Sequence, residues 1–306
     1  MIVVTLVALI GPTAVGKTEI SHRLTERIPF EIVSCDSMQV YRGMDIGTGK
    51  PSPDEKERYH YHMIDIVSPH HRYSAGEYVR DASRAIENIA QREKIPLVVG
   101  GTGMYLDSLL YGISSMPEAN LSLRRELMEE VKREGISSFH ERLEKVDPES
   151  ARRIHPDDVR RIVRALEVYY LTGKPISEIQ REEGRVPRYN HLIVGIYRAR
   201  NELYERINAR VEKMFEEGLV KEVAGLLERG CGADLPALQA LGYKEVMEFL
   251  NDVYDLEEAK RRIKKNTRNF AKRQMTYFRK NKEIRWFKLD EERERIIREA
   301  EKFLSR

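Results

Sequence analysis

Cysteine is scarce in this sequence: Cys35 and Cys231 are the only two among 306 residues. Two cysteines exclude a disulfide framework and a zinc module built from several cysteines, and they are typical of a reducing compartment. The histidines between residues 60 and 71 have no matching set of cysteines or carboxylates, so we expect none of them to bind a metal.

Long hydrophobic runs are also absent. The longest, at residues 2–10 (IVVTLVALI), is far shorter than the ~20 residues that a membrane span requires. No basic segment precedes it and a glycine-rich motif follows at once, which argues against a signal peptide. We therefore expect a soluble, cytoplasmic protein with no membrane partner.

An excess of one charge is missing as well. The chain carries 53 Lys and Arg against 50 Asp and Glu, a net charge of +3. This balance does not by itself indicate a nucleic-acid partner, so local clustering of charge must decide. Charged residues make up 34% of the chain, but they alternate regularly with apolar residues, which argues against disorder.

Short apolar runs alternate with helical patterns in the first third of the chain. Residues 2–10, 31–35, 63–67 and 96–101 are expected to be strands buried in a parallel sheet, and 75–93 an amphipathic helix. Strands that alternate with helices predict right-handed β-α-β units and a doubly wound α/β fold.

The pattern changes in the middle of the chain. Residues 116–189 show helical periodicity, many charges and no convincing strand, whereas 192–197 and 284–289 again resemble strands. The length fits about two domains of ~150 residues each. We expect an α/β catalytic core from 1–115 and 190–306, with a mostly helical insertion domain between its two parts.

A phosphate-binding motif follows the first predicted strand. The sequence GPTAVGKT matches G-x-x-x-x-G-K-[ST] and comprises Gly11, Pro12, Thr13, Ala14, Val15, Gly16, Lys17 and Thr18. Glycines let backbone N–H groups turn toward phosphate oxygens, and the N-terminus of the following helix adds its dipole. Lys17 supplies a positive charge and Thr18 a hydroxyl for Mg²⁺, the expected cofactor. The motif alone predicts a bound di- or triphosphate, such as that of a nucleotide.

Asp36 is the acidic residue expected beside this P-loop. Strand 96–101 ends in glycines, whereas Asp36 follows strand 31–35, where open α/β sheets bind ligands. It could hold Mg²⁺ through water or act as a general base. The equally weighted alternative is a helix N-cap, since Asp-Ser commonly caps helices.

Three further segments carry weaker signals. Thr102 in GGTG offers a hydroxyl after a strand, although paired glycines often form only a turn. Arg206 and Arg210 share a helical face that suits a pyrophosphate or, equally, ion pairs with neighbouring acids. Arginines at 160–164 could reach phosphates or form surface ion pairs.

The segment between Lys260 and Arg285 is strongly basic, since Glu283 is its single acid. Aromatic residues, among them Phe270 and Tyr277, lie between the basic ones and could stack on unpaired bases or form the core face of an amphipathic helix. The one-sided charge favours a nucleic-acid partner.

Together these pieces resemble one family, the bacterial-type tRNA dimethylallyltransferases (tRNA isopentenyltransferases). The matching stretches run in one order from residue 11 to about 280: GPTAVGKT, DSMQVYRGMDIGTGKP, HYHMID, GGTGMY, HPDDVRRIVRALEVY with TGKPIS, RINARVEKMFEEGLVKEV, LQALGYKE and TRNFAKRQMTYFRK. The resemblance implies a P-loop NTPase-like fold. It also implies transfer of a dimethylallyl group from dimethylallyl diphosphate to N6 of adenine 37 in tRNAs that read codons beginning with U.

The resemblance implies a role for each part of the site. The P-loop with Lys17 would hold a diphosphate rather than ATP, steadied by Arg206 or Arg210. Asp36 would accept a proton from the adenine N6, and Thr102 would contact the flipped base or the diphosphate. A base stacked in an RNA loop must be flipped out to be reached, which the insertion would assist by clamping the anticodon stem-loop.

Further residues match segments that contact tRNA in this family. They are Asp36, Ser37, Met38, Gln39 and Thr102 near the reaction centre; Arg124, Arg160, Arg161, Ile162, Val163 and Arg164 in the insertion; and Leu241, Gly242, Tyr243, Lys244, Glu245, Val246, Arg268, Lys272 and Arg273 in the C-terminal part.

Other functions remain open from the sequence. A small-molecule P-loop kinase would transfer phosphate but leaves the insertion and the basic segment without a purpose. An isopentenyltransferase that acts on free AMP, ADP or ATP would not need them either. A non-enzymatic RNA-binding module would leave the P-loop and Asp36 idle. We expect a monomer without an obligate protein partner.

Overall fold

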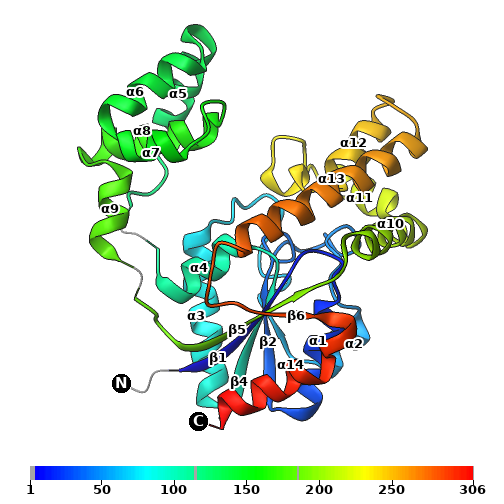
Figure 1. The fold of residues 1–306 in the computed structure, drawn as a ribbon. Helices are drawn as coiled ribbons and strands as arrows, with labels where there is room; N and C mark the ends of the chain where they lie inside the picture. Colours follow the sequence, from blue (N-terminus) through cyan, green and yellow to red (C-terminus); the bar gives the residue numbers. More distant parts are fainter. Residues whose placement is uncertain (1–3, 114–115, 185, 306) are drawn as a thin grey trace. The chain divides into compact units, whose positions relative to one another are not determined.

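The computed structural model describes residues 4–113, 116–184 and 186–305 (Figure 1). Contacts between residues divide the chain into two units. The larger comprises Met1–Leu110 and Pro187–Arg306, and the smaller comprises Tyr111–Val186. Residues 114 and 115, next to the predicted boundary between 115 and 116, lie outside the described residues. Residues 2 and 3 of the first predicted strand lie outside them as well.

The larger unit contains one six-stranded sheet with the order β3-β2-β4-β1-β5-β6, and all neighbouring strands are parallel. The strands are β1 (Thr5–Ile10), β2 (Phe30–Cys35), β3 (Tyr61–His62), β4 (Ile95–Gly100), β5 (Asn190–Tyr197) and β6 (Arg285–Lys288). Runs rich in Val, Ile and Leu form these strands because a parallel sheet is covered by helices on both faces. The predicted α/β fold with a parallel sheet is confirmed.

The register brings the ends of the central strands together. Ile10 of β1 pairs with Gly100 of β4 and Gly195 of β5, and Gly100 also pairs with Cys35 of β2. The segments that follow β1, β2 and β4 therefore leave the sheet at one edge. These are the segments that contain the P-loop, Asp36 and Thr102.

The prediction of a strand at 63–67 is wrong. The strand β3 ends at His62, and Met63 and Asp65 have left-handed backbone angles, with φ of 66° and 57°. Such residues cannot continue a regular strand. Only Val67 makes a single parallel bridge, to Tyr41. Within this run, Ile66 and Val67 instead pack against the core cluster that includes Val40, Tyr41 and Met44 of the segment after β2.

The helices of the larger unit cover the sheet and extend beyond its carboxyl edge (Figure 1). They are α1 (Lys17–Arg27), α2 (Pro53–Arg58), α3 (Ala75–Gln91), α4 (Gly103–Tyr111, whose last residue belongs to the smaller unit), α10 (Arg200–Glu216), α11 (Leu219–Glu228), the short 3₁₀ helix η1 (Pro236–Gln239), α12 (Tyr243–Leu250), α13 (Leu256–Phe278) and α14 (Leu289–Leu304). Buried residues of α1, α10 and α14 join one core with β1 and β5.

The smaller unit consists of helices in its described residues: α5 (Leu121–Glu134), α6 (Ile136–Val146), α7 (Pro148–Arg153), α8 (Val159–Thr172) and α9 (Ile176–Glu183). Its core includes Leu127, Phe139, Leu143 and Leu166, so it has an apolar centre of its own. The helical character expected for this segment is confirmed. Across the described residues of the whole chain, no helix is long and apolar enough to cross a membrane.

Candidate active site

The P-loop joins β1 to α1 through two left-handed residues. Ala14 has φ of 62° and Gly16 has φ of 113°, and α1 begins at Lys17. A side chain at Gly11 would place its Cβ 2.6 Å from the carbonyl oxygen of Ile196, so only glycine fits where the loop passes β5. The backbone therefore curves tightly in front of a helix N-terminus, which is the geometry that binds phosphate.

Lys17 lies inside this curve. Its ammonium donates hydrogen bonds to the carbonyl oxygens of Gly11 at 2.9 Å and Pro12 at 2.8 Å. Burial lowers the pKa of Lys17 to about 8, although the nearby Asp36 carboxylate opposes this shift. An ammonium that is poorly solvated and tied only to neutral carbonyls is well prepared to bind an anion.

Arg198 supports the P-loop from behind and was not anticipated from the sequence. Its Nε donates to the carbonyl oxygen of Val15 at 2.8 Å, and the buried guanidinium also pairs with Glu202 and Asp290. The contact fixes the position of this carbonyl in the loop. In the sequence, Arg198 is marked only by its position directly after a predicted strand. Many surface residues also follow strands, so this position alone does not indicate a role.

Asp36 follows the last residue of β2. Its Oδ1 accepts a hydrogen bond from the backbone N–H of Met38 at 2.9 Å, which closes a local Asx turn. Residues 37–40 form turns rather than a helix, so the helix N-cap alternative does not apply. The carboxylate lines the same cavity as Lys17, and both groups act on each other electrostatically.

Thr102 joins the loop after β4 to the loop after β2. Its Oγ1 accepts a hydrogen bond from the backbone N–H of Ser37 at 3.2 Å, and its own N–H donates to the carbonyl oxygen of Cys35. A Cβ at Gly100 would lie 2.0 Å from that carbonyl, so the two strands approach closely here. Thr102 therefore fixes the turn that begins with Asp36.

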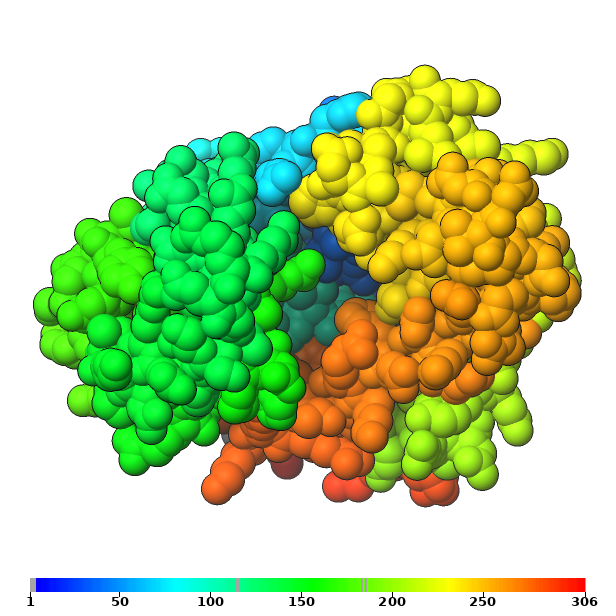
Figure 2. Space-filling model, turned by 90° about the horizontal axis from the view of Figure 1, so that it is seen from above, coloured from blue at the N-terminus to red at the C-terminus, as the bar shows by residue number. Residues whose placement is uncertain are grey.

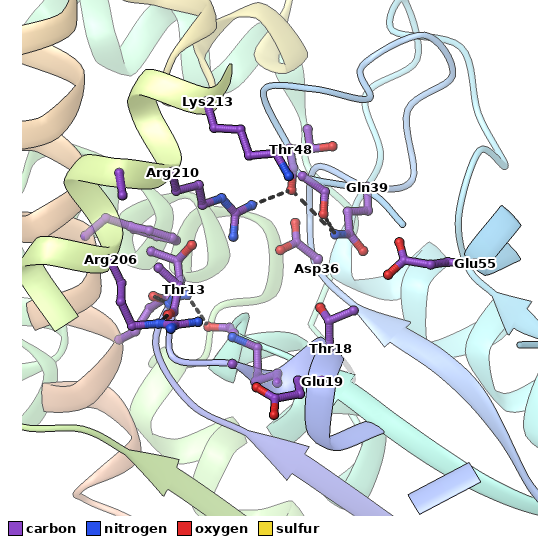
Figure 3. A pocket seen from close by; sticks show the side chains of 18 of the residues that line it. Thr13, Thr18, Glu19, Asp36, Gln39, Thr48, Glu55, Arg206, Arg210 and Lys213 are labelled. Carbon is purple, nitrogen blue, oxygen red and sulfur yellow. Dashed lines mark hydrogen bonds between the residues drawn. The ribbon is translucent and has the colours of Figure 1, made fainter. Parts of the chain in front are cut away.

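Arg206 and Arg210 of α10 both line the cavity, as their spacing predicted, but they differ in environment (Figure 3). Arg206 is exposed and its Nε donates to the carbonyl oxygen of Ala14 at 3.0 Å. Arg210 donates to the carbonyl oxygen of Thr48 at 3.3 Å. Burial lowers the pKa of Arg210, and the Asp36 carboxylate partly restores it.

Gln274 of α13 is a further residue of the site that sequence reasoning missed. Its side-chain oxygen accepts from the backbone N–H of Thr13 at 2.9 Å, and its nitrogen donates to the carbonyl oxygen of Gly101 at 3.0 Å. It connects the loops after β1 and β4. The available signal was a polar residue on a buried stripe that also contains Ala271 and Phe278.

These residues surround a cavity of about 710 Å³. Its lining is rich in charged and hydroxyl groups, and Figure 3 shows Asp36, Gln39, Arg206 and Arg210 around it. The lining comprises Thr13, Ala14, Gly16, Lys17, Thr18, Glu19, His22, Asp36, Gln39, Thr48, Gly49, Glu55, Gly101, Arg206, Ala209, Arg210, Lys213, Phe270 and Gln274. Four cations and the P-loop make this a site for a polyanion.

A second cavity of about 370 Å³ adjoins the first and is more apolar. Its walls include Ile207, Val211, Met214, Leu241 and Ile263. The two cavities share Thr13, Asp36, Thr48, Arg210 and Phe270. In Figure 2 the yellow and orange surface of the segment with η1, α12 and α13 lies beside the blue N-terminal part of the chain.

The site thus combines a polyanion cavity and an apolar cavity, with the Asp36 carboxylate on the wall that they share. Comparison with known proteins shows the family to which the chain belongs. The family model described as IPP transferase matches residues 39–281, most of the chain. The chain belongs to this family. A second model, described as isopentenyl transferase, matches residues 4–66, which include the P-loop and Asp36.

Relatives of this IPP transferase family member match along most of their length. A tRNA dimethylallyltransferase of Natranaerobius thermophilus is 47% identical over 290 residues, which cover 94% of this chain and 87% of the relative. A protein of Thermotoga maritima with the same description is 49% identical over 280 residues, covering 91% of this chain and 90% of the relative.

Solved structures show the same fold for this IPP transferase family member. A full-length tRNA isopentenylpyrophosphate transferase of Bacillus halodurans is 39% identical, with a TM-score of 0.73 and coverage of 98% of this chain and 97% of that chain. A eukaryotic dimethylallyltransferase described as acting on tRNA is 29% identical, with a TM-score of 0.84 and coverage of 99% and 80%.

The three residues after Asp36, all predicted to contact tRNA, differ in their surroundings. Ser37 and Met38 line the second cavity. Gln39 instead holds the loop, since its Oε1 accepts from Ser34 and its Nε2 donates to the carbonyl oxygens of Thr48 and Gly49.

The segment from Leu241 to Val246 is mostly buried. Leu241 and Gly242 line the second cavity, and Lys244 is exposed. Tyr243, Glu245 and Val246 are buried, so they support the exposed residues of this segment from inside the protein. On α13, Lys272 and Arg273 are exposed, whereas Arg268 donates to Asn208 at 2.7 Å.

The residues of the smaller unit that were predicted to contact tRNA also differ in exposure. Arg160 and Arg161 are exposed at the start of α8, where Asp158 caps the helix. Arg124 and Arg164 both pair with the fully buried Glu167, at 2.9 Å and 2.6 Å. Ile162 and Val163 lie in the core of the unit.

Proposed function

We propose that this chain transfers a dimethylallyl group from dimethylallyl diphosphate to N6 of adenine 37 in tRNAs that read codons beginning with U, and releases diphosphate. The observation that carries the proposal is the position of Asp36 on the wall shared by a polyanion cavity and an apolar cavity. The relatives described as tRNA dimethylallyltransferases support the same activity.

The polyanion cavity suits the diphosphate. As the allylic C–O bond breaks, the bridging oxygen gains negative charge, which groups already in place stabilise best. Lys17, Arg210 and the P-loop N–H groups offer this stabilisation, and Arg198 keeps the loop in shape. The dimethylallyl group extends from the diphosphate toward the apolar side chains of the second cavity.

Mg²⁺ fits the oxygen donors of the first cavity. Thr18 is exposed there and Asp36 faces the same space. The described residues contain no cluster of three or more acids, His or Cys that could hold a metal. This suits Mg²⁺, which keeps several waters and binds substrate phosphates with one or two protein oxygens. When bound, the ion adds positive charge beside the leaving diphosphate.

Asp36 acts as the general base. The lone pair of the adenine N6 is delocalised into the ring, so the amine must lose a proton to the Asp36 carboxylate as the N–C bond forms. The Asx turn with Met38 holds the carboxylate in place, and Thr102 fixes the turn through Ser37. A base placed in this way accelerates transfer by roughly 10²–10⁴-fold.

The acceptor is the anticodon stem-loop of tRNA. Adenine 37 must leave its stack to reach Asp36, and the second cavity opens beside Ser37, Met38 and Arg273. The helical unit clamps the stem-loop through exposed cations such as Arg160 and Arg161, and the larger unit offers the exposed Lys272 of α13 to the RNA backbone.

The test offers labelled dimethylallyl diphosphate with unmodified tRNA, AMP and ATP in parallel. Label on tRNA alone, lost when adenine 37 is replaced, is the expected result. Label on AMP or ATP would move the chain to the class that acts on free nucleotides. Release of γ-phosphate from ATP without any transfer of label would overturn the proposal in favour of a kinase or nucleotidase.

A further inference from the structure

Glu222 of α11 is a carboxylate that the reaction does not use, yet four donors converge on it. Its Oε2 accepts from the backbone N–H groups of Asp45 and Ile46, both at 2.8 Å. Its Oε1 accepts from the backbone N–H of Gly47 at 3.1 Å and from the hydroxyl of Tyr243 at 2.6 Å. The loop and α11 are about 175 residues apart in sequence.

Tyr243 makes this arrangement rigid. It is fully buried, and a Cβ on Gly47 would lie 2.4 Å from its ring, so the loop fits against the ring closely. Burial and the neighbouring Glu222 raise the pKa of Tyr243. The phenol therefore stays protonated and donates its hydrogen bond to Glu222 at neutral pH.

The loop held by Glu222 leads directly to the polyanion cavity. The next residue, Thr48, accepts hydrogen bonds at its carbonyl oxygen from Arg210 at 3.3 Å and Gln39 at 3.5 Å. Gly49 has φ of 59°, and a Cβ there would lie 1.9 Å from the Arg210 guanidinium. The backbone of this loop therefore determines where the guanidinium of Arg210 can lie.

Glu222 itself lines neither cavity. No described residue of α11 lines either cavity. Any influence of Glu222 on the reaction therefore passes through the residues that it holds. Among these, Gly47 lines the second cavity, and the next residue, Thr48, binds Arg210. This distinguishes it from a residue that contacts a substrate.

We propose that Glu222 is a positioning residue that sets the place of Arg210 in the polyanion cavity by anchoring residues 45–47. The inference rests on the proposed function only in identifying the anion as the diphosphate of the prenyl donor. Without this carboxylate, three N–H groups lose their shared partner, the carbonyl of Thr48 moves, and Arg210 loses its tether. Affinity for diphosphate then falls, while affinity for tRNA does not.

The test compares Glu222→Gln with Glu228→Gln, an exposed residue of the same helix that carries the same change of charge. Binding of magnesium diphosphate is measured by calorimetry, KM for each substrate by kinetics, and folding by thermal unfolding. Glu222→Gln is expected to weaken diphosphate binding and raise KM for the donor by about tenfold, with KM for tRNA unchanged. Behaviour equal to that of Glu228→Gln overturns the inference.

Two further variants separate positioning from general stability. Tyr243→Phe removes one of the four donors and keeps the ring, so a smaller loss in the same direction is expected even if Glu222→Gln does not fold. In an Arg210→Met background, Tyr243→Phe and Glu222→Gln should weaken diphosphate binding no further, because their effect acts through Arg210. Additive losses would show a role independent of Arg210 and would overturn the inference.

Diphosphate binding also separates this inference from the proposed function. If the wild-type chain binds diphosphate but transfers no label to tRNA, the function is wrong and the comparison of variants by calorimetry still decides the role of Glu222. If the wild type transfers label but Glu222→Gln binds diphosphate normally, only the inference fails.

Discussion

The side-chain oxygen of Gln274 accepts a hydrogen bond from the backbone N–H of Thr13 at 2.9 Å, although the two residues are 261 positions apart. The same side chain donates to Gly101, so one residue of α13 connects two of the loops that form the site. The basic helix α13, which we propose contacts RNA, is thereby also part of the P-loop site.

Replacement of Gln274 by Leu should weaken binding of dimethylallyl diphosphate by about tenfold, because unsatisfied buried polar groups cost roughly 1–3 kcal/mol. The N–H of Thr13 and the carbonyl of Gly101 would both lose their partner. Fluorescence or calorimetric titration of the donor without tRNA measures this. Thr276→Val on the exposed face of α13 serves as the control, and equal affinities for both variants would contradict the prediction.

Binding of the donor should depend on pH through Lys17. Its pKa is lowered to about 8 by burial, so the ammonium is lost in the free protein as the pH rises above that value. Affinity for dimethylallyl diphosphate should be constant below pH 8 and fall by up to about tenfold per pH unit above it, with proton uptake on binding. Lys17→Arg, which stays charged, should remove this dependence. An unchanged slope in that variant would assign the titration to another group.

Asp36→Asn tests the general base with little change of shape. Asparagine can still accept the hydrogen bond from Met38, but its amide cannot take the proton of N6. Single-turnover transfer should fall by about 10²–10⁴-fold, while binding of the donor and of tRNA remains close to that of the wild type. Full turnover by this variant would exclude Asp36 as the base.

The two arginines of α10 should differ in importance. Arg210 is held by Thr48 beside Asp36, whereas Arg206 is exposed and bonded to a P-loop carbonyl. Arg210→Met should reduce kcat/KM for the donor about 10²-fold, as expected when a charge that faces the leaving group is lost, and Arg206→Met by less than about tenfold. The reverse order would show that Arg206 makes the diphosphate contact.

Exposed cations of the helical unit should contribute to tRNA binding without sequence readout. A double variant Arg160→Gln with Arg161→Gln should raise Kd for tRNA and reduce the slope of log K against log salt by about 1–2. Lys132→Gln with Arg133→Gln on α5 makes the same change of charge elsewhere on the unit. Filter binding at several salt concentrations compares them, and equal slopes would place the RNA on another surface.

The sequence predicts those features that depend on neighbouring residues. Apolar runs indicated β1, β2, β4 and β5, and the register of these strands explains why Lys17, Asp36 and Thr102 meet at one edge. The run at 63–67 was misleading because Met63 and Asp65 have positive φ angles, and because the backbone N–H groups of Asp65, Ile66 and Val67 bind the segment after β2.

Residues that act through distant partners could not be predicted in this way. Gln274, Glu222 and Arg198 bind backbone groups between 173 and 261 positions away, and no local pattern marks such partners. Exposure could not be predicted either. Arg160 and Arg164 lie in one short motif, yet the first is exposed and the second pairs with the buried Glu167.

The connection between α13 and the P-loop has a consequence for synthesis of the protein on the ribosome. The nascent chain carries the P-loop and Asp36 long before Arg210, Phe270 and Gln274 have been synthesised. Because contacts so distant in sequence form late in folding, the polyanion cavity closes only after α13 has been synthesised. A chain that is still being synthesised therefore has no complete site. It cannot bind the prenyl donor or capture a tRNA that the ribosome is using.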